Sequence, residues 1–287
     1  MSQRETTRQA WLARFLRVTD HVTAHLDEDL DLDSLAAVAC LSPYHFHRCW
    51  HAFTGETVAQ MVTRLRLHHA AGALIKDDDP VEAVARQAGY GSAAAFSRAF
   101  SRAFGRSPAA YRAAGRLAPP LTLTPKDEGD PAMYDVRIEK TEPLTLAAIR
   151  HVGPYMEVEQ PFNRVFGWAM GAGAMGPDTR VIGVYHDDPS EVPEAELRSD
   201  VGISVSPGTA TEDPVHLIDV PGGRHAVLRF KGAYAELMGA YQWFYGTWLP
   251  QSGHEPGDAP CYEEYLTNPR EVTPADNITD IHIPLKG

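Results

Sequence analysis

The stretch VEAVARQAGYGSAAAFSRAFSRAFGRSPAAYR (81–112) is the most informative part of the 287-residue sequence. Pro80 precedes a short apolar-periodic segment, and Gly89 supplies a turn before a second helical segment that runs into Gly105. Two short helices joined by a tight turn are the helix-turn-helix pattern. The stretch therefore predicts such a motif over about 83–104.

The same pattern occurs 50 residues upstream. Five residues match at one constant offset: Ser42, Phe46, Arg48, Trp50 and Gly55 correspond to Ser92, Phe96, Arg98, Phe100 and Gly105. The duplication predicts a second motif over about 34–54, in which Asp33 or Ser34 caps the first short helix and Ser42-Pro43 begins the second.

Two further helices are expected around these motifs. Trp11, Phe15, Val18, Val22 and Leu26 recur at helical spacing and predict a helix over about 6–27. The segment 57–75 is a continuous helical pattern about 28 Å long at ~1.5 Å per residue. A spacer of that length can place two recognition helices about one DNA turn, ~34 Å, apart.

Charge divides the chain into two parts. Residues 1–116 hold 14 Lys/Arg, 12 Asp/Glu and seven His, whereas the remainder holds 12 Lys/Arg and 26 Asp/Glu. The segment 116–132 is rich in Pro, Gly and Asp and is expected to be a linker. We therefore predict an all-α domain over 1–115 and a different, acidic domain over 133–287.

The C-terminal part also contains a repeat. LAAIRHVGPY (146–155) resembles HAVLRFKGAY (225–234), and Tyr185 and Pro189 correspond to Tyr265 and Pro269, 80 residues later. Each copy alternates in the order strand, strand, helix, strand, strand. The pattern predicts an α+β domain of two ββαββ-type units on an antiparallel sheet.

Several classes of protein are excluded by the sequence. No run approaches 18 apolar residues, and the polar N-terminal segment has no apolar signal core, so we expect a cytoplasmic protein without membrane association. Cys40, His45, His47, Cys49 and His51 do not share a helix face, and Gly171, Gly173 and Gly176 lack the flanking order of a dinucleotide-binding loop. We expect no metal site and no cofactor.

The N-terminal half resembles the DNA-binding domain of the bacterial AraC/XylS family of transcription regulators. The resemblance covers about 100 residues and includes A-x3-G-[FY]-x-S-x3-F-x-R-x-F…G-x-S-P-x2-[YF]-R, present here from Ala85 to Arg112. It implies a homeodomain-like tandem helix-turn-helix fold, double-stranded DNA as a partner, and admits RNA polymerase as another.

The resemblance also implies which residues read DNA. The first recognition helix would present Tyr44, His47, Arg48 and His51, and the second would present Ala93, Ala94, Ala95, Arg98 and Arg102. Arginine contacts guanine or phosphate well, whereas alanine offers only a methyl group to thymine. We therefore expect base specificity to come mostly from the first helix.

The C-terminal half resembles the GyrI-like (SHS2) effector-binding domain over about 150 residues, through G-V-Y-x-D-x-P (183–189), Y-E-x-Y-L-x-N-P (262–269) and I-x-I-P-L (281–285). Such domains bind hydrophobic, often cationic compounds beside a glutamate, which matches Glu263. The other expected contacts are aromatic: Tyr265, Tyr185, Phe166, Trp168 and Trp243. A one-residue slip in register would put Glu264 in the site instead.

Two other functions remain open for this half. Some GyrI-like domains are associated with hydrolysis, and a carboxylate with a raised pKa in an apolar pocket could serve as an acid or base. The residues show no paired second acid or nucleophile, so we expect no enzyme. The acidic domain could instead bind a protein such as gyrase or imitate DNA.

Overall fold

A computed structural model describes residues 3–26, 28, 30–76, 78–115 and 133–287. These residues fall into two compact units. One contains Gln9–Pro43 and residues 54–115, and the other contains residues 3–8, Tyr44–Phe53 and residues 133–287. The expected linker, 116–132, lies outside the described residues.

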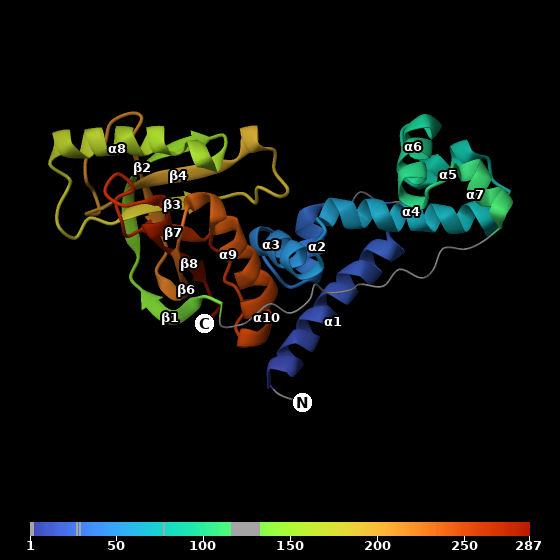
Figure 1. Ribbon diagram of the computed structural model, residues 1–287, viewed down its shortest axis with the longest axis horizontal. Helices are drawn as coiled ribbons and strands as arrows, with labels where there is room; N and C mark the ends of the chain where they lie inside the picture. Colours follow the sequence, from blue (N-terminus) through green and yellow to red (C-terminus); the bar gives the residue numbers. More distant parts are fainter. Residues whose placement is uncertain (1–2, 27, 29, 77, 116–132) are drawn as a thin grey trace. The chain divides into compact units, whose positions relative to one another are not determined.

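The N-terminal half is helical, as its periodicity predicts. Its helices are α1 (Gln3–Ala24), α2 (Leu32–Val38), α3 (Pro43–Thr54), α4 (Val58–Lys76), α5 (Val81–Gln87), α6 (Ala93–Phe104) and α7 (Pro108–Ala114). The segments α4 to α7 share one apolar core, in which Leu74, Phe96, Phe100 and Tyr111 pack together (Figure 1).

Short polar residues set the helix boundaries. Ser92 and Ser107 each cap a helix by accepting a backbone N–H three residues ahead. The cap of α2 differs from the expected Asp33 or Ser34, because Asp31 accepts the backbone N–H of Ser34 at 2.8 Å. A side chain caps a helix only from the residue before its first turn, and that residue is Asp31.

The C-terminal half forms one eight-stranded antiparallel sheet in the order β1-β6-β8-β7-β3-β4-β2-β5. The strands are β1 (Asp135–Thr141), β2 (Leu144–Val152), β3 (Val181–Tyr185), β4 (Arg198–Val205), β5 (His216–Val220), β6 (Gly223–Lys231), β7 (Tyr262–Tyr265) and β8 (Ile278–Pro284). The expected α+β fold with an antiparallel sheet is confirmed.

The duplication is visible in the sheet order. Counted inward from the two edges of the sheet, each strand of one copy occupies the same position as its equivalent in the other copy: β1 matches β5, β6 matches β2, and β8 matches β4. The equivalent strands β7 and β3 pair at the centre, where Gly183 lies opposite Glu263. Ion pairs to a buried aspartate repeat as well: Arg150 binds Asp200 in the first copy, and Arg229 binds Asp280 in the second. The first strand of each copy pairs with the second strand of the other copy.

Each copy contributes one helical segment. The first is η1 (Tyr155–Glu157) followed by α8 (Glu159–Ala172), which packs on β2 and β4 (Figure 1). The second runs through η3 (Tyr234–Glu236), α9 (Leu237–Trp243), a π-helical turn η4 (Phe244–Trp248) and α10 (Leu249–Ser252). Alternation along each strand divides the core, so that Ala147 and Ile149 face α8 whereas Leu146 and Ala148 belong to the opposite face.

Candidate functional site: an aromatic cavity around Glu263

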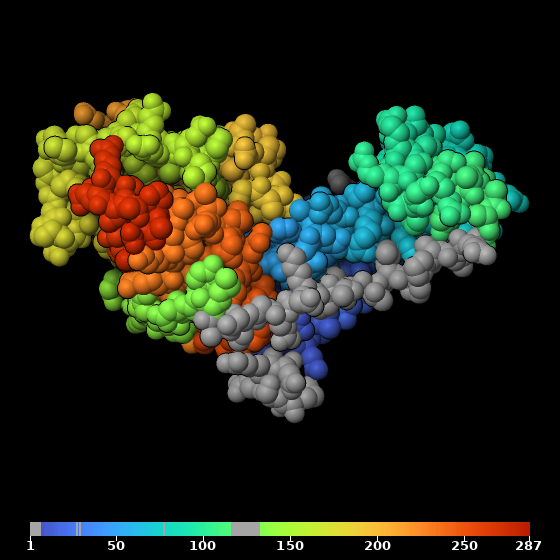
Figure 2. Space-filling view, viewed as in Figure 1, coloured from blue at the N-terminus to red at the C-terminus, as the bar shows by residue number. Residues whose placement is uncertain are grey.

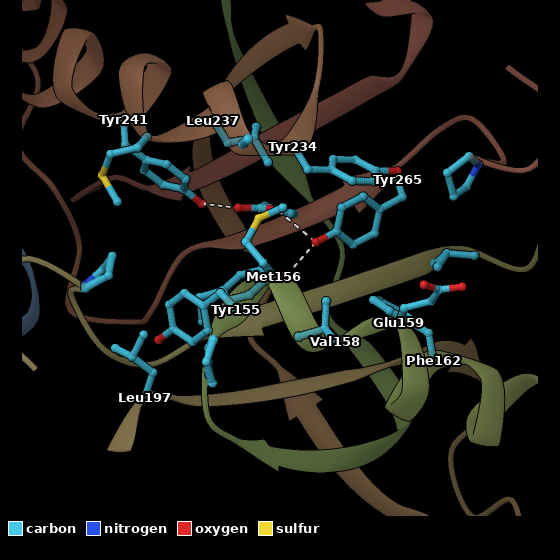
Figure 3. A pocket seen from close by; sticks show the side chains of 18 of the residues that line it. Tyr155, Met156, Val158, Glu159, Phe162, Leu197, Tyr234, Leu237, Tyr241 and Tyr265 are labelled. Carbon is cyan, nitrogen blue, oxygen red and sulfur yellow. Dashed lines mark hydrogen bonds between the residues drawn. The ribbon is translucent and has the colours of Figure 1, made fainter. Parts of the chain in front are cut away.

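A cavity of about 1150 Å³ opens between α8, α9 and the central strands β3 and β7. Its wall is mainly apolar and aromatic, the composition typical of a small-molecule site. Representative lining residues are Tyr155, Met156, Phe162, Phe166, Tyr185, Tyr234, Leu237, Met238, Tyr241, Tyr245, Glu263 and Tyr265 (Figure 3).

Glu263 is the buried acid of this cavity, with only 5% of its surface exposed. Tyr241 donates a hydrogen bond to its Oε1 at 2.9 Å, and Tyr265 donates to its Oε2 at 2.8 Å (Figure 3). The hydroxyl of Tyr185 lies 2.5 Å from that of Tyr265, which extends the chain of hydroxyl groups. The described residues place no Lys, Arg or His within ion-pair distance of this carboxylate.

The two adjacent glutamates of β7 have opposite electrostatic environments. Burial raises the pKa of Glu263 to about 7, although the hydrogen bonds from Tyr265 and Tyr241 pull it downward. Burial acts in the same direction on Glu264, but the nearby His282 ring and the hydrogen bonds from Arg180 lower its pKa to about 2. Strand alternation separates them, so Glu263 faces the cavity and Glu264 forms a bidentate pair with Arg180.

Rings meet edge to face around the carboxylate. Tyr265 contacts Tyr234 and Phe162 with centroid distances of 5.5 Å in both cases, and Phe162 stacks on Phe166. Gly183 leaves space for the Tyr185 ring, because a Cβ at this glycine would lie 3.0 Å from the ring edge. The absence of a side chain at Gly183 thus allows the Tyr185 ring to pack over the backbone of its own strand.

The structure places four of the six expected effector contacts in the cavity wall, namely Glu263, Tyr265, Tyr185 and Phe166. Trp168 and Trp243 lie outside that wall. Trp168 packs beside the apolar core under α8. Trp243 is buried and meets Tyr134 edge to face at 5.1 Å. Helices α8 and α9 carry aromatic residues on more than one face, so composition alone does not identify the rings that face the cavity.

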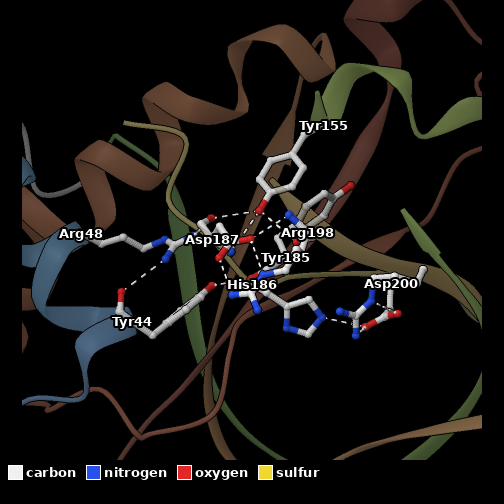
Figure 4. Close-up of polar contacts among 9 residues, drawn as sticks. Tyr44, Arg48, Tyr155, Tyr185, His186, Asp187, Arg198 and Asp200 are labelled. Atoms are coloured by element: carbon white, nitrogen blue, oxygen red, sulfur yellow. Dashed lines mark hydrogen bonds and ion pairs between the residues drawn. The ribbon is translucent and has the colours of Figure 1, made fainter. Parts of the chain in front are cut away.

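Helix α3 contributes to the same compact unit as the cavity. Tyr44 donates to the carbonyl of Tyr185 at 3.1 Å, accepts the backbone N–H of Cys261 at 3.2 Å, and contacts the Cys261 thiol. Arg48 donates to the carbonyl of Asp187 at 2.7 Å, and its guanidinium lies 3.9 Å from the Tyr44 ring centroid (Figure 4).

The other expected DNA-reading residues of α3, His47 and His51, also lie against the C-terminal domain. His47 Nδ1 lies 3.5 Å from a carboxylate oxygen of Glu191. Arg48, His51 and Ala52 form part of the cavity wall. This contact could not be predicted from the sequence, because a polar helix face carries no local signal of what covers it.

Helix α6 has a different environment. Ala94, Arg98 and Arg102 are exposed, whereas Ala93 and Ala95 are partly covered. Phe96 and Phe100 of the same helix are fully buried, as expected for core positions. The expected reading face of α6 therefore carries two exposed arginine side chains and one exposed methyl group.

Comparison with known proteins matches each half of the chain to a protein family. Residues 134–286 match the GyrI-like small molecule binding domain, and residues 35–114 match a helix-turn-helix domain. A DNA gyrase inhibitor of Yersinia enterocolitica is 33% identical over 152 residues, which cover 51% of this chain and 93% of that protein. A DNA gyrase inhibitor of Pectobacterium carotovorum is 34% identical over 135 residues, covering 46% of this chain and 86% of that protein.

Solved structures resemble each half separately. The C-terminal domain of EcmrR superposes with a TM-score of 0.46 at 18% identity, covering 54% of this chain and 98% of that chain. The DNA-binding domain of AdpA, solved with a target DNA, gives a TM-score of 0.31 at 37% identity, covering 34% of this chain and 87% of that chain.

These features define a class of DNA-binding helix-turn-helix transcription regulators that carry a small-molecule-binding domain. The chain belongs to the GyrI-like family, with an AraC-type helix-turn-helix region at its N-terminal side. The predicted combination of the two families is confirmed. Among the described helices, none is long and apolar enough to cross a membrane.

Proposed function

We propose that this regulator binds an amphiphilic organic cation in the aromatic cavity, with Glu263 as the countercharge, and that occupancy of the cavity controls DNA binding by the helix-turn-helix motifs. The observation that carries the proposal is the buried Glu263 carboxylate, which tyrosine hydroxyl groups hold in place. Within the part of the chain that the structure describes, no cationic side chain lies at ion-pair distance from it. An organic cation would supply the missing charge and would also stack on the surrounding rings.

The raised pKa of Glu263 supports this assignment. A carboxyl group with a pKa of about 7 is partly protonated at neutral pH, because burial disfavours the isolated charge. A bound cation lowers that pKa and is therefore held more tightly as pH rises from 6 to 8. The cavity also has the volume for a drug-sized molecule.

For DNA, the proposed contacts remain those predicted from the sequence. In α3 they are Tyr44, His47, Arg48 and His51, and in α6 they are Ala93, Ala94, Ala95, Arg98 and Arg102. The exposed arginines of α6 suit phosphate contacts, which position a protein without specifying sequence. Selection of duplexes by the full chain should therefore give strong base preference in one half-site and weak preference in the other. Equal preference in both would contradict this division of roles.

The ligand proposal is tested by thermal denaturation of the full chain with tetraphenylphosphonium and with its neutral relative triphenylphosphine oxide. At 100 times its Kd, a ligand that binds only the folded protein stabilises it by about 2.7 kcal/mol. The cation should stabilise the wild-type protein, and Glu263→Gln should lose most of this effect.

Glu264→Gln is the matched control, since it makes the same chemical change one residue away on the opposite strand face. It should retain the response to the cation. Equal stabilisation by the neutral compound, or an unchanged response in Glu263→Gln, would refute the role of Glu263.

A second candidate function is binding of DNA gyrase by residues 134–286, because the curated relatives matched by this region are described as DNA gyrase inhibitors. The acidic charge of this half suits a basic partner surface. Salt-sensitive binding of the full chain to purified gyrase, unaffected by Glu263→Gln, would favour that candidate over a ligand sensor.

A further inference from the structure

The predicted DNA-reading face of α3 is the face that contacts the cavity-bearing domain. Tyr44, His47, Arg48 and His51 are spaced i, i+3, i+4 and i+7, so they form one stripe along the helix. Tyr44 and Arg48 donate hydrogen bonds to backbone carbonyls of the GyrI-like domain. His47 lies 3.5 Å from a carboxylate oxygen of Glu191, and His51 lines the cavity. A base pair and this domain cannot occupy the same side chains together.

We propose that the GyrI-like domain holds α3 in a docked, DNA-incompetent state, and that a cavity ligand acts directly on the recognition helix because α3 forms part of the cavity wall. This inference rests on the proposed function and names its regulation. No signal has to pass through the linker, because Arg48, His51 and Ala52 would contact the ligand themselves.

One buried polar side chain at this contact, His45, has a partner for each of its ring nitrogens. His45, next to the reading stripe, has no exposed surface, and its ring nitrogens lie 3.1 Å from the Tyr245 hydroxyl and 3.3 Å from the Ala259 carbonyl. Burial and the nearby Arg48 charge lower the His45 pKa to about 3, so the ring is neutral. Buried polar groups with such partners stabilise one specific arrangement, because leaving them unpaired is costly.

Close backbone packing also marks the contact. Gly246, in the π-helical turn η4, lies so near α3 that a Cβ added there would be 2.6 Å from the carbonyl oxygen of Ala52. In the space-filling view, the orange surface of this segment abuts the light-blue surface of α3 (Figure 2). The glycine is therefore a place where a single methyl group would separate the two surfaces.

The sign of the coupling follows from the cavity wall. A ligand that touches both Glu263 and the α3 residues binds more tightly when α3 is docked, because undocking removes one side of the cavity. Such a ligand weakens DNA binding, and DNA weakens ligand binding by the same factor. The docked state is thus antagonistic to the first helix-turn-helix motif.

The test uses Gly246→Ala in the full chain, with Gly239→Ala of α9 as the matched control, since a Cβ there meets nothing within 4 Å. A duplex is first selected from a random pool by the wild-type chain, and its affinity is measured by fluorescence anisotropy. Gly246→Ala should bind this duplex about fivefold or more tightly than wild type, within the usual range of allosteric coupling, and Gly239→Ala should not. The inference is overturned if Gly246→Ala and wild type bind the duplex equally well although maleimide labels Cys261 faster in the variant, since faster labelling shows that α3 has undocked.

A second measurement keeps the proposal falsifiable if the methyl group fails to separate the surfaces. The Cys261 thiol has no exposed surface and lies beneath Tyr44, so undocking uncovers it. Saturating DNA should therefore speed maleimide labelling of Cys261 in the wild-type chain, read by peptide mass spectrometry. Unchanged labelling overturns the inference.

Repeating both measurements with tetraphenylphosphonium distinguishes failure of the docking inference from failure of the proposed function. Tetraphenylphosphonium should slow Cys261 labelling and weaken DNA binding of the wild-type chain, and tighter DNA binding would overturn the sign. If this cation does not bind, the cation-binding function fails, while the DNA-dependent labelling still decides the docking. If no duplex binds any variant, both proposals fall together through the DNA-binding function.

Discussion

Glu263 and Glu264 offer a direct test of the electrostatics, because adjacent residues should change stability with pH in opposite directions. For Glu263 the folded-state pKa of about 7 lies above the ordinary value of 4.5. Between these values the unfolded chain releases its proton first, so stability falls as pH rises. At ~1.36 kcal/mol per pH unit, this interval corresponds to roughly 3 kcal/mol.

Glu263→Gln removes this titration while keeping the shape of the side chain. The variant should match the wild type near pH 4.5 and become more stable by roughly 3 kcal/mol at pH 8, since the buried charge is gone. Urea denaturation of the full chain at a series of pH values, followed by tryptophan fluorescence, measures the difference.

Glu264→Gln should behave in the opposite way. Its folded-state pKa of about 2 lies below 4.5, so the ionised group stabilises the protein above pH 4.5 and this contribution is lost as pH falls toward 2. The variant should therefore be less stable than wild type at pH 7, because Arg180 loses its partner. A Glu263→Gln effect that is the same at pH 5 and pH 8 would refute the reasoning.

Two further predictions concern the frame of the sheet. Gly202→Ala should destabilise the full chain by about 3 kcal/mol or more, because a Cβ there would lie 2.3 Å from the backbone oxygen of Ala147; thermal denaturation against Gly239→Ala measures this. Arg150→Ala should cost about 1–3 kcal/mol in urea denaturation, since Asp200 is 1% exposed and would lose its bidentate partner, and a cost near zero would contradict it.

Much of this architecture could be predicted from the sequence, because hydrophobic spacing reports directly on local structure. The helical spacing of Trp11, Phe15 and Val18 in α1 requires only neighbouring residues to be interpreted. Strand alternation in β7 places Glu263 on the cavity face and Glu264 on the other.

Other features depend on contacts between distant segments and leave no local pattern. The rotation of α8 and α9 decides that Phe166 faces the cavity while Trp168 and Trp243 do not. The cover over α3 is of the same kind, since a stripe of Tyr, His and Arg suits a DNA groove and an array of backbone carbonyls equally well.

That dual suitability explains how a recognition helix can be held and still be released. Arg48 and Tyr44 bond the carbonyls of Asp187 and Tyr185, which accept the same donors that phosphate and base edges accept. Exchange between domain and DNA therefore replaces one set of hydrogen bonds with another, and the net difference is small. An apolar contact would hold α3 more firmly, but its face would then have no donors for DNA. A polar contact lets a ligand with a modest preference for the docked state decide which partner α3 binds.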